Sequence, residues 1–121
     1  MWCRSRSSAH WWCSASAVWP TEVLGDHVAR LSPLTDDDAA AMIGGIHAAT
    51  LLTGHRGSPL VDTAGLTSIL QRVSRLADDV PEVVELDLNP VIARPQDVQV
   101  VDVRIRVAPA APRDPFLRRL R

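Results

Sequence analysis

The chain has 121 residues, a formal net charge of -1 at pH 7 and 46% hydrophobic residues, which suffices for one modest globular domain. No dense basic stripe accompanies this near-neutral charge, so nucleic acid is not expected as a partner. No run approaches the roughly 18 apolar residues that a membrane-spanning helix needs. Cys3 and Cys13 form no metal-ligand pattern. The composition therefore favours a cytoplasmic protein without a membrane partner.

The first 19 residues differ from the rest of the chain. They contain all four tryptophans and both cysteines and show neither helical nor strand periodicity. The codons of Met1–Cys3, read two bases later, encode Val-Val, and those of His10–Cys13 encode Leu-Val-Val. A single extra base near Pro20 would restore the frame. We therefore predict that residues 1–19 are a disordered, out-of-frame translation; the alternative is a genuine but unusual N-terminus.

Residues 20–107 are predicted to form a small α+β unit. Short strands are expected at 21–23 and 27–31, around a turn at Gly25 and Asp26. Thr35 is a good N-cap for a first helix, and the three aspartates at 36–38 suit the helix dipole. This acidic cluster is therefore interpreted as a helix start rather than a catalytic carboxylate pair. The apolar stripe of this helix consists of Ala39, Met42, Ile43, Ile46 and Ala49.

A loop at 53–61 precedes a second helix, which Asp62 or Thr63 would cap. Apolar residues recur along it at helical spacing, namely Leu66, Ile69, Leu70, Val73 and Leu76. Arg56 lies in the loop between Gly54 and Gly57, where its guanidinium group can bind phosphate or carboxylate. The alternative is that Arg56 pins the loop to Asp62 or to a helix C-terminus.

The most regular pattern lies at 85–90 and 98–107, where apolar and polar residues alternate and predict the two strands of a hairpin. Its apolar side holds Leu86, Leu88, Val101, Val103 and Ile105. A turn centred on Pro95 and Gln96 would pair Glu85 with Arg106, Asp87 with Arg104 and Asn89 with Asp102.

Asn89 and Asp102 would then stand opposite each other with side chains roughly 5 Å apart at Cβ. Amide and carboxylate oxygens are hard ligands, which Mg²⁺ prefers when it bridges to phosphate oxygens. The alternative is a solvated sheet face that carries ordinary salt bridges. No nucleophile–base constellation accompanies this pair, and no residue is predicted to be catalytic.

The sequence resembles the end of the ATP-grasp domain in NDP-forming acyl-CoA synthetases, the group of ADP-forming acetate–CoA ligase and the succinyl-CoA synthetase β-subunit. The matching runs span about residues 20 to 108, namely 21–26, 30–34, 38–43, 51–57, 85–92 and 100–105. The resemblance implies a partial ATP-grasp lobe, with two helices packed on a small, mostly antiparallel sheet. It also implies that Asn89 and Asp102 hold the Mg²⁺ of the nucleotide and that Asp87 lies nearby. The loop of Arg56 lies where the family has it, which makes Arg56 a candidate nucleotide contact.

The resemblance implies a parent that interconverts acid, CoA and ATP with acyl-CoA, ADP and phosphate through acyl phosphate and phosphohistidine steps. CoA-binding and ligase domains would be its partners. In that family the adenine pocket lies mostly on a preceding lobe, so the isolated chain is expected to be inactive and to bind Mg²⁺ with ATP or ADP weakly or not at all. The alternative is a non-catalytic remnant or interaction module.

The last segment, residues 108–121, is rich in proline and alanine and ends in basic residues. Such a composition is typical of an extended tail. It resembles the C-termini of bacterial proteins in which a GNAT-type acetyltransferase is fused to synthetase-like domains.

Overall fold

The computed structural model describes residues 1–7, 10–15, 26–54, 57 and 59–110; for 2–7 and 10–15 it describes the backbone only. Helices and strands follow one another as the α+β prediction requires. They are β1 (Trp2–Ser7), β2 (His10–Ala15), β3 (Val28–Leu31), α2 (Asp36–Gly45), α3 (Ala49–Leu52), α4 (Thr63–Asp79), β4 (Val83–Leu88), β5 (Val91–Ala93), β6 (Val98–Val100) and β7 (Val103–Val107). The single-turn helix α3 is an addition to the two helices expected.

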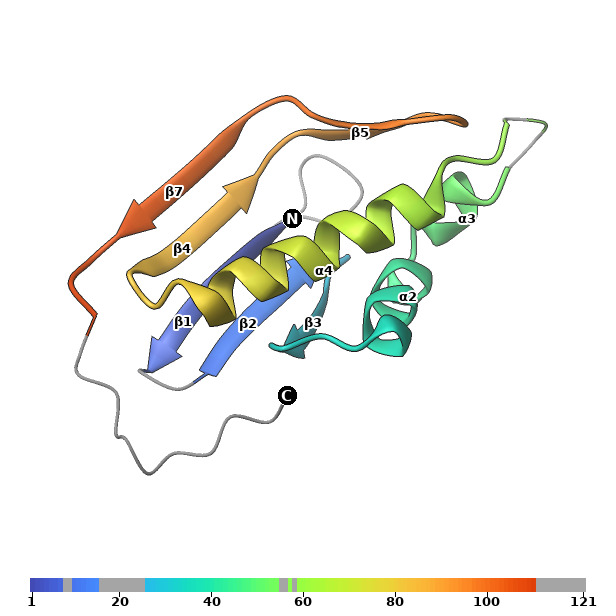
Figure 1. The fold of residues 1–121 in the computed structure, drawn as a ribbon. Helices are drawn as coiled ribbons and strands as arrows, with labels where there is room; N and C mark the ends of the chain where they lie inside the picture. Colours follow the sequence, from blue (N-terminus) through green and yellow to red (C-terminus); the bar gives the residue numbers. More distant parts are fainter. Residues whose placement is uncertain (8–9, 16–25, 55–56, 58, 111–121) are drawn as a thin grey trace.

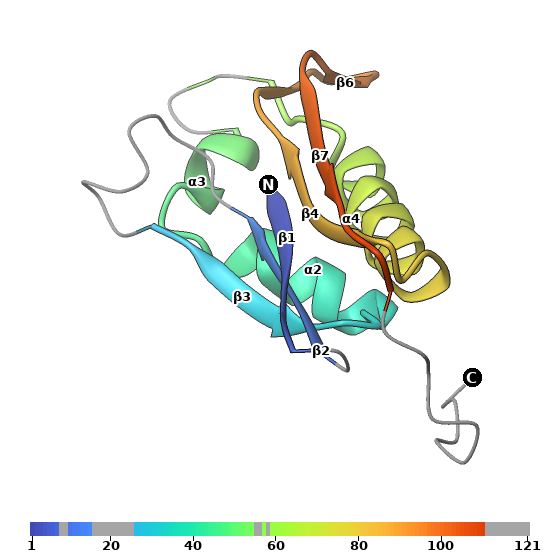
Figure 2. The ribbon, with the colours of Figure 1, turned by 90° about the vertical axis from the view of Figure 1, so that its left-hand side faces the viewer.

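Five strands form an antiparallel sheet in the order β3-β2-β1-β4-β7, and β5 pairs with β6 in a separate two-stranded sheet. The long helix α4 crosses the larger sheet obliquely, with α2 beside it (Figure 1). Both helices contact each other and the strands, so they form the second layer of a two-layer unit. Figure 2 shows α2 and α4 on the same side of the sheet, with α4 next to β4.

The core lies between α2, α4 and β4. Met42 and Leu70 are fully buried, and Leu86 of β4 is 4% exposed. The whole buried cluster consists of Ala39, Met42, Ile43, Leu70, Val73, Val83, Leu86 and Leu88. Most of these residues come from the apolar stripes of both helices and from one face of β4, so the periodic patterns predict most of the core. Val83 lies outside the predicted strand, and Leu76 of the second stripe is 36% exposed.

Helix α2 begins as predicted and ends earlier than predicted. The Thr35 hydroxyl accepts a hydrogen bond from the Asp38 N–H at 3.1 Å, and the Asp38 carboxylate accepts one from the Thr35 N–H, which completes a capping box. The apolar stripe predicted a helix through Ala49, but α2 stops at Gly45. Gly44 and Gly45 weaken the helix at this point, and after the C-cap residue Ile46 the N–H groups of His47 and Ala48 bind a side chain from outside the helix, as described below.

Strands β1 and β2 occupy segments in which the side-chain pattern predicts no regular element. Strand β1 pairs with β2 on one side and with β4 on the other. Main-chain hydrogen bonds in a sheet require no alternation of side chains, so neighbouring strands can supply both partners. The out-of-frame origin of residues 1–19 stays a prediction, and the strand expected at 21–23 lies outside the described residues.

The predicted hairpin is present, but it is divided into two ladders. Strands β4 and β7 form the first and β5 and β6 the second, with the break at Asn89 and Pro90. Pro90 has no N–H to donate to a ladder. The hairpin turn is where it was predicted, because the Arg94 N–H donates to the Asp97 carbonyl at 2.8 Å.

The apolar side of the hairpin differs in burial between its two strands. Leu86 and Leu88 of β4 are buried as expected, whereas Val103 and Ile105 of β7 are 49% and 51% exposed. The pattern predicts which side of the strand is apolar, but burial also requires a covering element. Helix α4 covers β4, and the apolar side of β7 extends beyond it.

Candidate functional site

Asn89 and Asp102 lie side by side, as the predicted register requires. Strand β4 pairs Glu85 with Arg106 and Asp87 with Arg104. Beyond the end of this ladder the Asn89 N–H donates to the Asp102 carbonyl at 3.1 Å, and the Val101 N–H donates to the Pro90 carbonyl at 3.0 Å. The three predicted cross-strand pairs are therefore confirmed in their backbone positions, and two oxygen-bearing side chains start from adjacent points.

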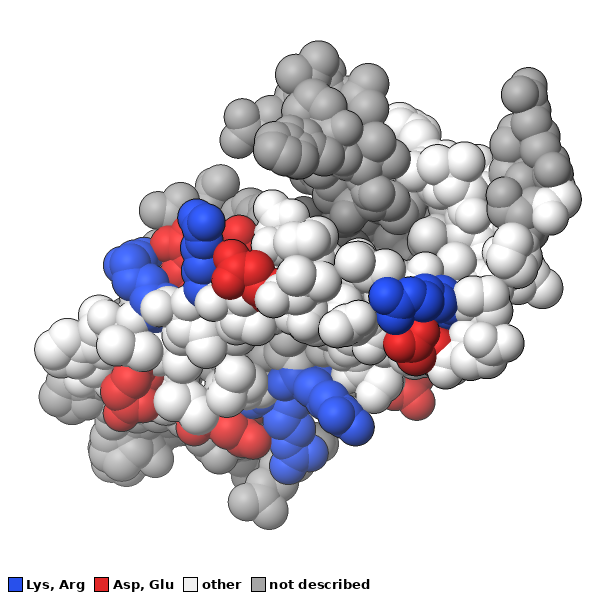
Figure 3. Space-filling view, turned by 90° about the horizontal axis from the view of Figure 1, so that it is seen from above, with Lys and Arg blue, Asp and Glu red and all other residues white. Residues whose placement is uncertain are grey.

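The charged side chains of this face make two ion pairs. Arg106 Nε lies 3.0 Å from Glu85 Oε2, whereas Arg104 Nε lies 3.5 Å from Asp102 Oδ2 rather than from Asp87 opposite it. The Asp102 carboxylate also accepts the Val103 N–H at 2.9 Å. Basic and acidic side chains accordingly lie next to one another on the face seen in Figure 3, where no large area of one sign is visible.

Asp87 has a different neighbour from the one the resemblance implies. The Met1 amino group donates to the Leu88 carbonyl at 3.2 Å, and its pKa is lowered by burial and, less strongly, raised by the negative charge of Asp87. An amino group thus lies near Asp87 on the β1 side of β4.

The donor set suits a hard cation only in part. Asn89 is exposed, and the Asp102 side chain is 53% exposed, so both oxygens are accessible from solvent. Among the described residues no group of three or more His, Cys, Asp or Glu could hold a metal ion. Mg²⁺ commonly keeps several waters and binds one or two carboxylates plus phosphate oxygens. The residues present fit that partial coordination, provided that Arg104 moves away from Asp102.

Arg56 lies outside the described residues, but the ends of its loop are placed. The Val61 N–H donates to the Leu52 carbonyl at 3.1 Å and closes the loop. The next N–H, that of Asp62, donates to the Arg94 carbonyl at 2.8 Å and joins the loop to the tip of the β5–β6 hairpin. In Figure 1 the start of α4 accordingly lies at the same end of the molecule as the tip of the β5–β6 hairpin, away from β4.

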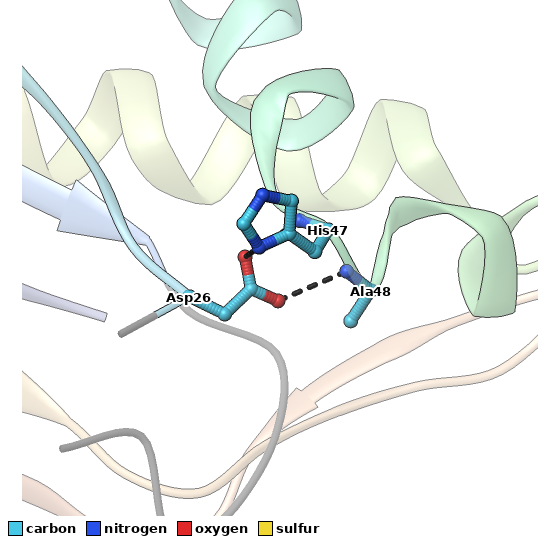
Figure 4. A network of polar contacts seen from close by, with 3 residues as sticks. All are labelled: Asp26, His47 and Ala48. Carbon is cyan, nitrogen blue, oxygen red and sulfur yellow. Dashed lines mark hydrogen bonds and ion pairs between the residues drawn. The ribbon is translucent and has the colours of Figure 1, made fainter. Parts of the chain in front are cut away.

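Asp26 holds the segment between α2 and α3, a role that the sequence analysis missed. Its buried carboxylate accepts the backbone N–H groups of His47 at 2.5 Å and Ala48 at 2.9 Å, with the His47 ring 3.6 Å away (Figure 4). Burial alone would raise the pKa of Asp26, but the Ala48 and His47 hydrogen bonds outweigh it and leave the pKa lowered. The signal in the sequence was an aspartate directly before a strand, which we assigned to a turn.

The aspartates at 36–38 are a helix start, as predicted. The Thr35 side chain is the main cause of the lowered pKa of Asp38, and Asp36 accepts a hydrogen bond from the Gln71 side chain of α4. These contacts account for the cluster structurally.

Two residues of α4 fix its neighbours and were also missed. Ser74 is buried; its hydroxyl accepts the Leu34 N–H at 2.8 Å and lies 3.1 Å from the Ser32 hydroxyl. Gly65 lies in the first turn, where a Cβ atom would be 2.8 Å from Val98 Cγ2 of β6. A polar residue inside the apolar stripe and a glycine three residues after the N-cap were the available signals.

The sequence pattern of the ATP-grasp domain family matches residues 19–107. The chain is 41% identical over 86 residues to the ADP-forming 4-hydroxybutyrate–CoA ligase of Nitrosopumilus maritimus, covering 69% of this chain and 12% of that protein. It is 38% identical over 84 residues to the β-subunit of the ADP-forming acetate–CoA ligase I of Pyrococcus furiosus, covering 69% and 36%. The chain therefore belongs to the ATP-grasp domain family.

Solved structures agree with this assignment. An acetyl-coenzyme A synthetase from Ca. Korarchaeum cryptofilum, in complex with coenzyme A and Mg-AMPPCP, superposes with a TM-score of 0.83 and 33% identity, covering 88% of this chain and 51% of that chain. The protein PH1788 of Pyrococcus horikoshii superposes with a TM-score of 0.80 and 29% identity, covering 89% and 47%. The chain spans about half the length of these structures and a smaller share of the sequence relatives, so it corresponds to a partial domain. No helix of the described part is long and apolar enough to cross a membrane.

Proposed function

We propose that this chain is the C-terminal part of an ATP-grasp domain that positions Mg-nucleotide in an ADP-forming acyl-CoA synthetase. The observation that carries the proposal is the adjacency of Asn89 and Asp102, fixed by the hydrogen bond between their backbones at the end of the β4–β7 ladder. A relative of the same family was solved with Mg-AMPPCP and coenzyme A, which supports nucleotide and CoA as ligands of the parent.

In this proposal Asp102 supplies a full negative charge and Asn89 a dipole to the cation. Mg²⁺, when bound, would neutralise charge on the phosphate oxygens during phosphoryl transfer. Two ladders flank the pair and hold its backbone, so little reorganisation is needed at these two positions. Arg104 compensates the Asp102 charge when no cation is present, and it would turn toward Asp87, its partner in the ladder, when a cation binds.

The proposed parent reaction is acid, CoA and ATP giving acyl-CoA, ADP and phosphate. CoA-binding and ligase domains would be the partners, in the cytoplasm, and the basic tail after residue 107 is consistent with a fused acetyltransferase. The relatives support the ligase class, since their names describe CoA ligases that form ADP. Arg56 is proposed as an additional nucleotide contact on the loop that the β5–β6 hairpin anchors.

A chimaera tests the proposal. Residues 19–107 would replace the matching segment of the Pyrococcus furiosus β-subunit, and ADP-forming ligase activity would be measured with acetate. We expect Asp102→Ala to lower kcat/KM by about a hundredfold or more, because loss of even an indirect metal contact costs 10- to 100-fold. Asn89→Ala should cost about tenfold, since it removes a dipole and leaves the charge.

Arg106→Ala is the matched control from the same polar face. It removes an exposed pair worth at most about 1 kcal/mol of stability and should leave the rate unchanged. Raising the Mg²⁺ concentration should partly restore the Asn89→Ala variant. Equal losses in all three variants would show that the polar face is structural, and an inactive chimaera that is folded would favour a non-catalytic remnant.

A further inference from the structure

Strand β7 is an edge strand of the five-stranded sheet. It pairs with β4 on one side and with no described strand on the other, as Figures 1 and 2 show. A free sheet edge presents alternate backbone N–H and C=O groups that can accept another strand. All five residues of β7 are exposed, so the described part of the chain leaves both faces of this strand accessible.

The side chains of this strand segment are sorted by face. Val101, Val103, Ile105 and Val107 are 49% to 67% exposed and form an apolar row that continues the buried side of β4. Asp102, Arg104 and Arg106 form the other row. Strand β7 is short and carries two arginines, which are features that limit edge pairing, but its exposed apolar row is typical of an association surface.

The charged side chains of this strand segment limit the registers in which another copy can pair with its edge. In an antiparallel pair of two identical strands, opposed residues lie on the same face, so only a few registers are possible. Centring the pair on Ile105 opposes Arg104 and Arg106 of the two copies. Centring it on Arg104 opposes Arg106 of each copy with Asp102 of the other, but it also opposes the two Arg104 side chains. Centring it on Val103 opposes Asp102 of each copy with Arg104 of the other, and Val101 with Ile105.

We propose that a second copy of this chain adds to the free edge of β7, antiparallel and centred on Val103, to give a two-fold dimer with a continuous sheet. The two Asp102–Arg104 pairs across the axis make this register complementary in charge, and the apolar rows of the two copies become neighbours. The proposal concerns the chain without a bound cation, since the same Asp102 carboxylate is the cation ligand of the proposed function.

Asp102 also explains why the dimer is reversible. Within one copy its carboxylate accepts the Val103 N–H at 2.9 Å and lies 3.5 Å from Arg104 Nε. In the dimer, the Val103 N–H would instead bind the backbone of the second copy, and the Asp102 carboxylate would bind the Arg104 of that copy. The carboxylate therefore caps the strand edge in the monomer and links the two copies in the dimer. Only one short strand segment of each copy takes part, whereas stable complexes bury about 1,200 Å² or more, so we expect association to depend on concentration.

Sedimentation equilibrium of the 121-residue chain under reducing conditions tests the proposal. The native chain should show a reversible monomer–dimer equilibrium. Arg104→Glu opposes two acidic residues and Asp102→Arg opposes two basic ones, so each variant alone should dimerise roughly tenfold more weakly or not at all. In an equimolar mixture of the two variants, a heterodimer opposes an acidic with a basic side chain at both pairs, so heterodimers should form.

Arg106→Glu is the matched control, since it makes the same charge change on the same strand but faces no charged residue in the proposed register. It should dimerise like the native chain, and circular dichroism should show that all variants are folded. A native chain that stays monomeric up to about 1 mM, or a mixture of folded variants that does not associate, would overturn the proposal. Loss of dimer in Arg106→Glu would indicate the register centred on Arg104 and would also overturn it.

Discussion

The Asp26 carboxylate accepts hydrogen bonds from backbone N–H groups between two helices, where no main-chain acceptor is available. After α2 ends at Gly45, the N–H groups of His47 and Ala48 have no intrahelical acceptor before α3 begins, and the Asp26 carboxylate satisfies both. Asp26 lies just before β3, so its hydrogen bonds connect this strand with the helical layer. Gly45 at the end of α2 lies close to Val28 of the same strand. The carboxylate is thus a tertiary link that local sequence patterns do not indicate.

The lowered pKa of Asp26 gives a pH dependence of stability. A carboxyl group whose folded-state pKa lies below its unfolded value of about 3.8 contributes stability above that value and loses it as the pH falls through the folded-state pKa. We expect Asp26→Asn to lower the free energy of unfolding at neutral pH, because an amide replaces the ionised acceptor. The difference from the native chain should shrink below about pH 3.8, as measured by urea unfolding.

Asp37→Asn is the control, because Asp37 is exposed in the first turn of α2. It should change the free energy of unfolding little at any pH. A deficit in Asp26→Asn that stays constant from pH 7 down to pH 2 would show that shape rather than charge accounts for the role of Asp26.

At the scale of elements, the junction between α4 and the β5–β6 hairpin depends on close approach. A Cβ at Gly65 would be 2.5 Å from Asp62 Oδ2 and 2.8 Å from Val98 Cγ2, whereas a Cβ at Gly44 of α2 meets nothing within 4 Å. The first contact involves the N-cap carboxylate of α4, which accepts the Gly65 N–H at 2.8 Å. The two glycines therefore differ in what an added methyl group does.

Alanine substitution at these two positions should change stability in opposite directions. Gly65→Ala should lower the free energy of unfolding by about 1–3 kcal/mol, because it overpacks the contact with β6 and the cap. Gly44→Ala should raise it by about 0.5–1 kcal/mol, since alanine is the better helix former at an open position. Thermal and urea unfolding measure both effects; a stabilised Gly65→Ala would contradict the close approach.

The elements also show what the sequence could predict. The cross-strand register was predictable because three polar pairs and the turn residues all agreed on it, and the cap of α2 was predictable from Thr35 and the aspartates after it. The end of α2, the burial of Ser74 and the exposure of Ile105 were not. Each of these depends on which distant residue or element lies opposite, and a local pattern contains no information about that.

For the whole molecule, structural similarity extends further than sequence similarity. The sequence relatives cover 69% of the chain, and the superposed structures cover 88%. The family pattern begins at residue 19, where the predicted change of frame falls. Strands β1 and β2 thus lie before the part of the sequence that matches the family.

The predicted frameshift is tested in the DNA. Removing one base near the codon of Pro20 should open a frame that encodes Val-Val and Leu-Val-Val in place of residues 1–3 and 10–13, and that continues upstream into the preceding lobe of an ATP-grasp domain. Resequencing this region of the gene checks it. Upstream DNA without such a frame would show that the N-terminal segment is genuine.

The position of β1 within the sheet has a consequence for how the chain folds. Trp2 pairs with Asp87, so one of the inner contacts of the sheet joins the beginning of the chain to a strand that follows every helix. Closing so long a loop is slow compared with forming helices. We therefore expect β1 and β4 to pair only after the helices between them have formed, so that the side of β1 that faces β4 stays open until late in folding.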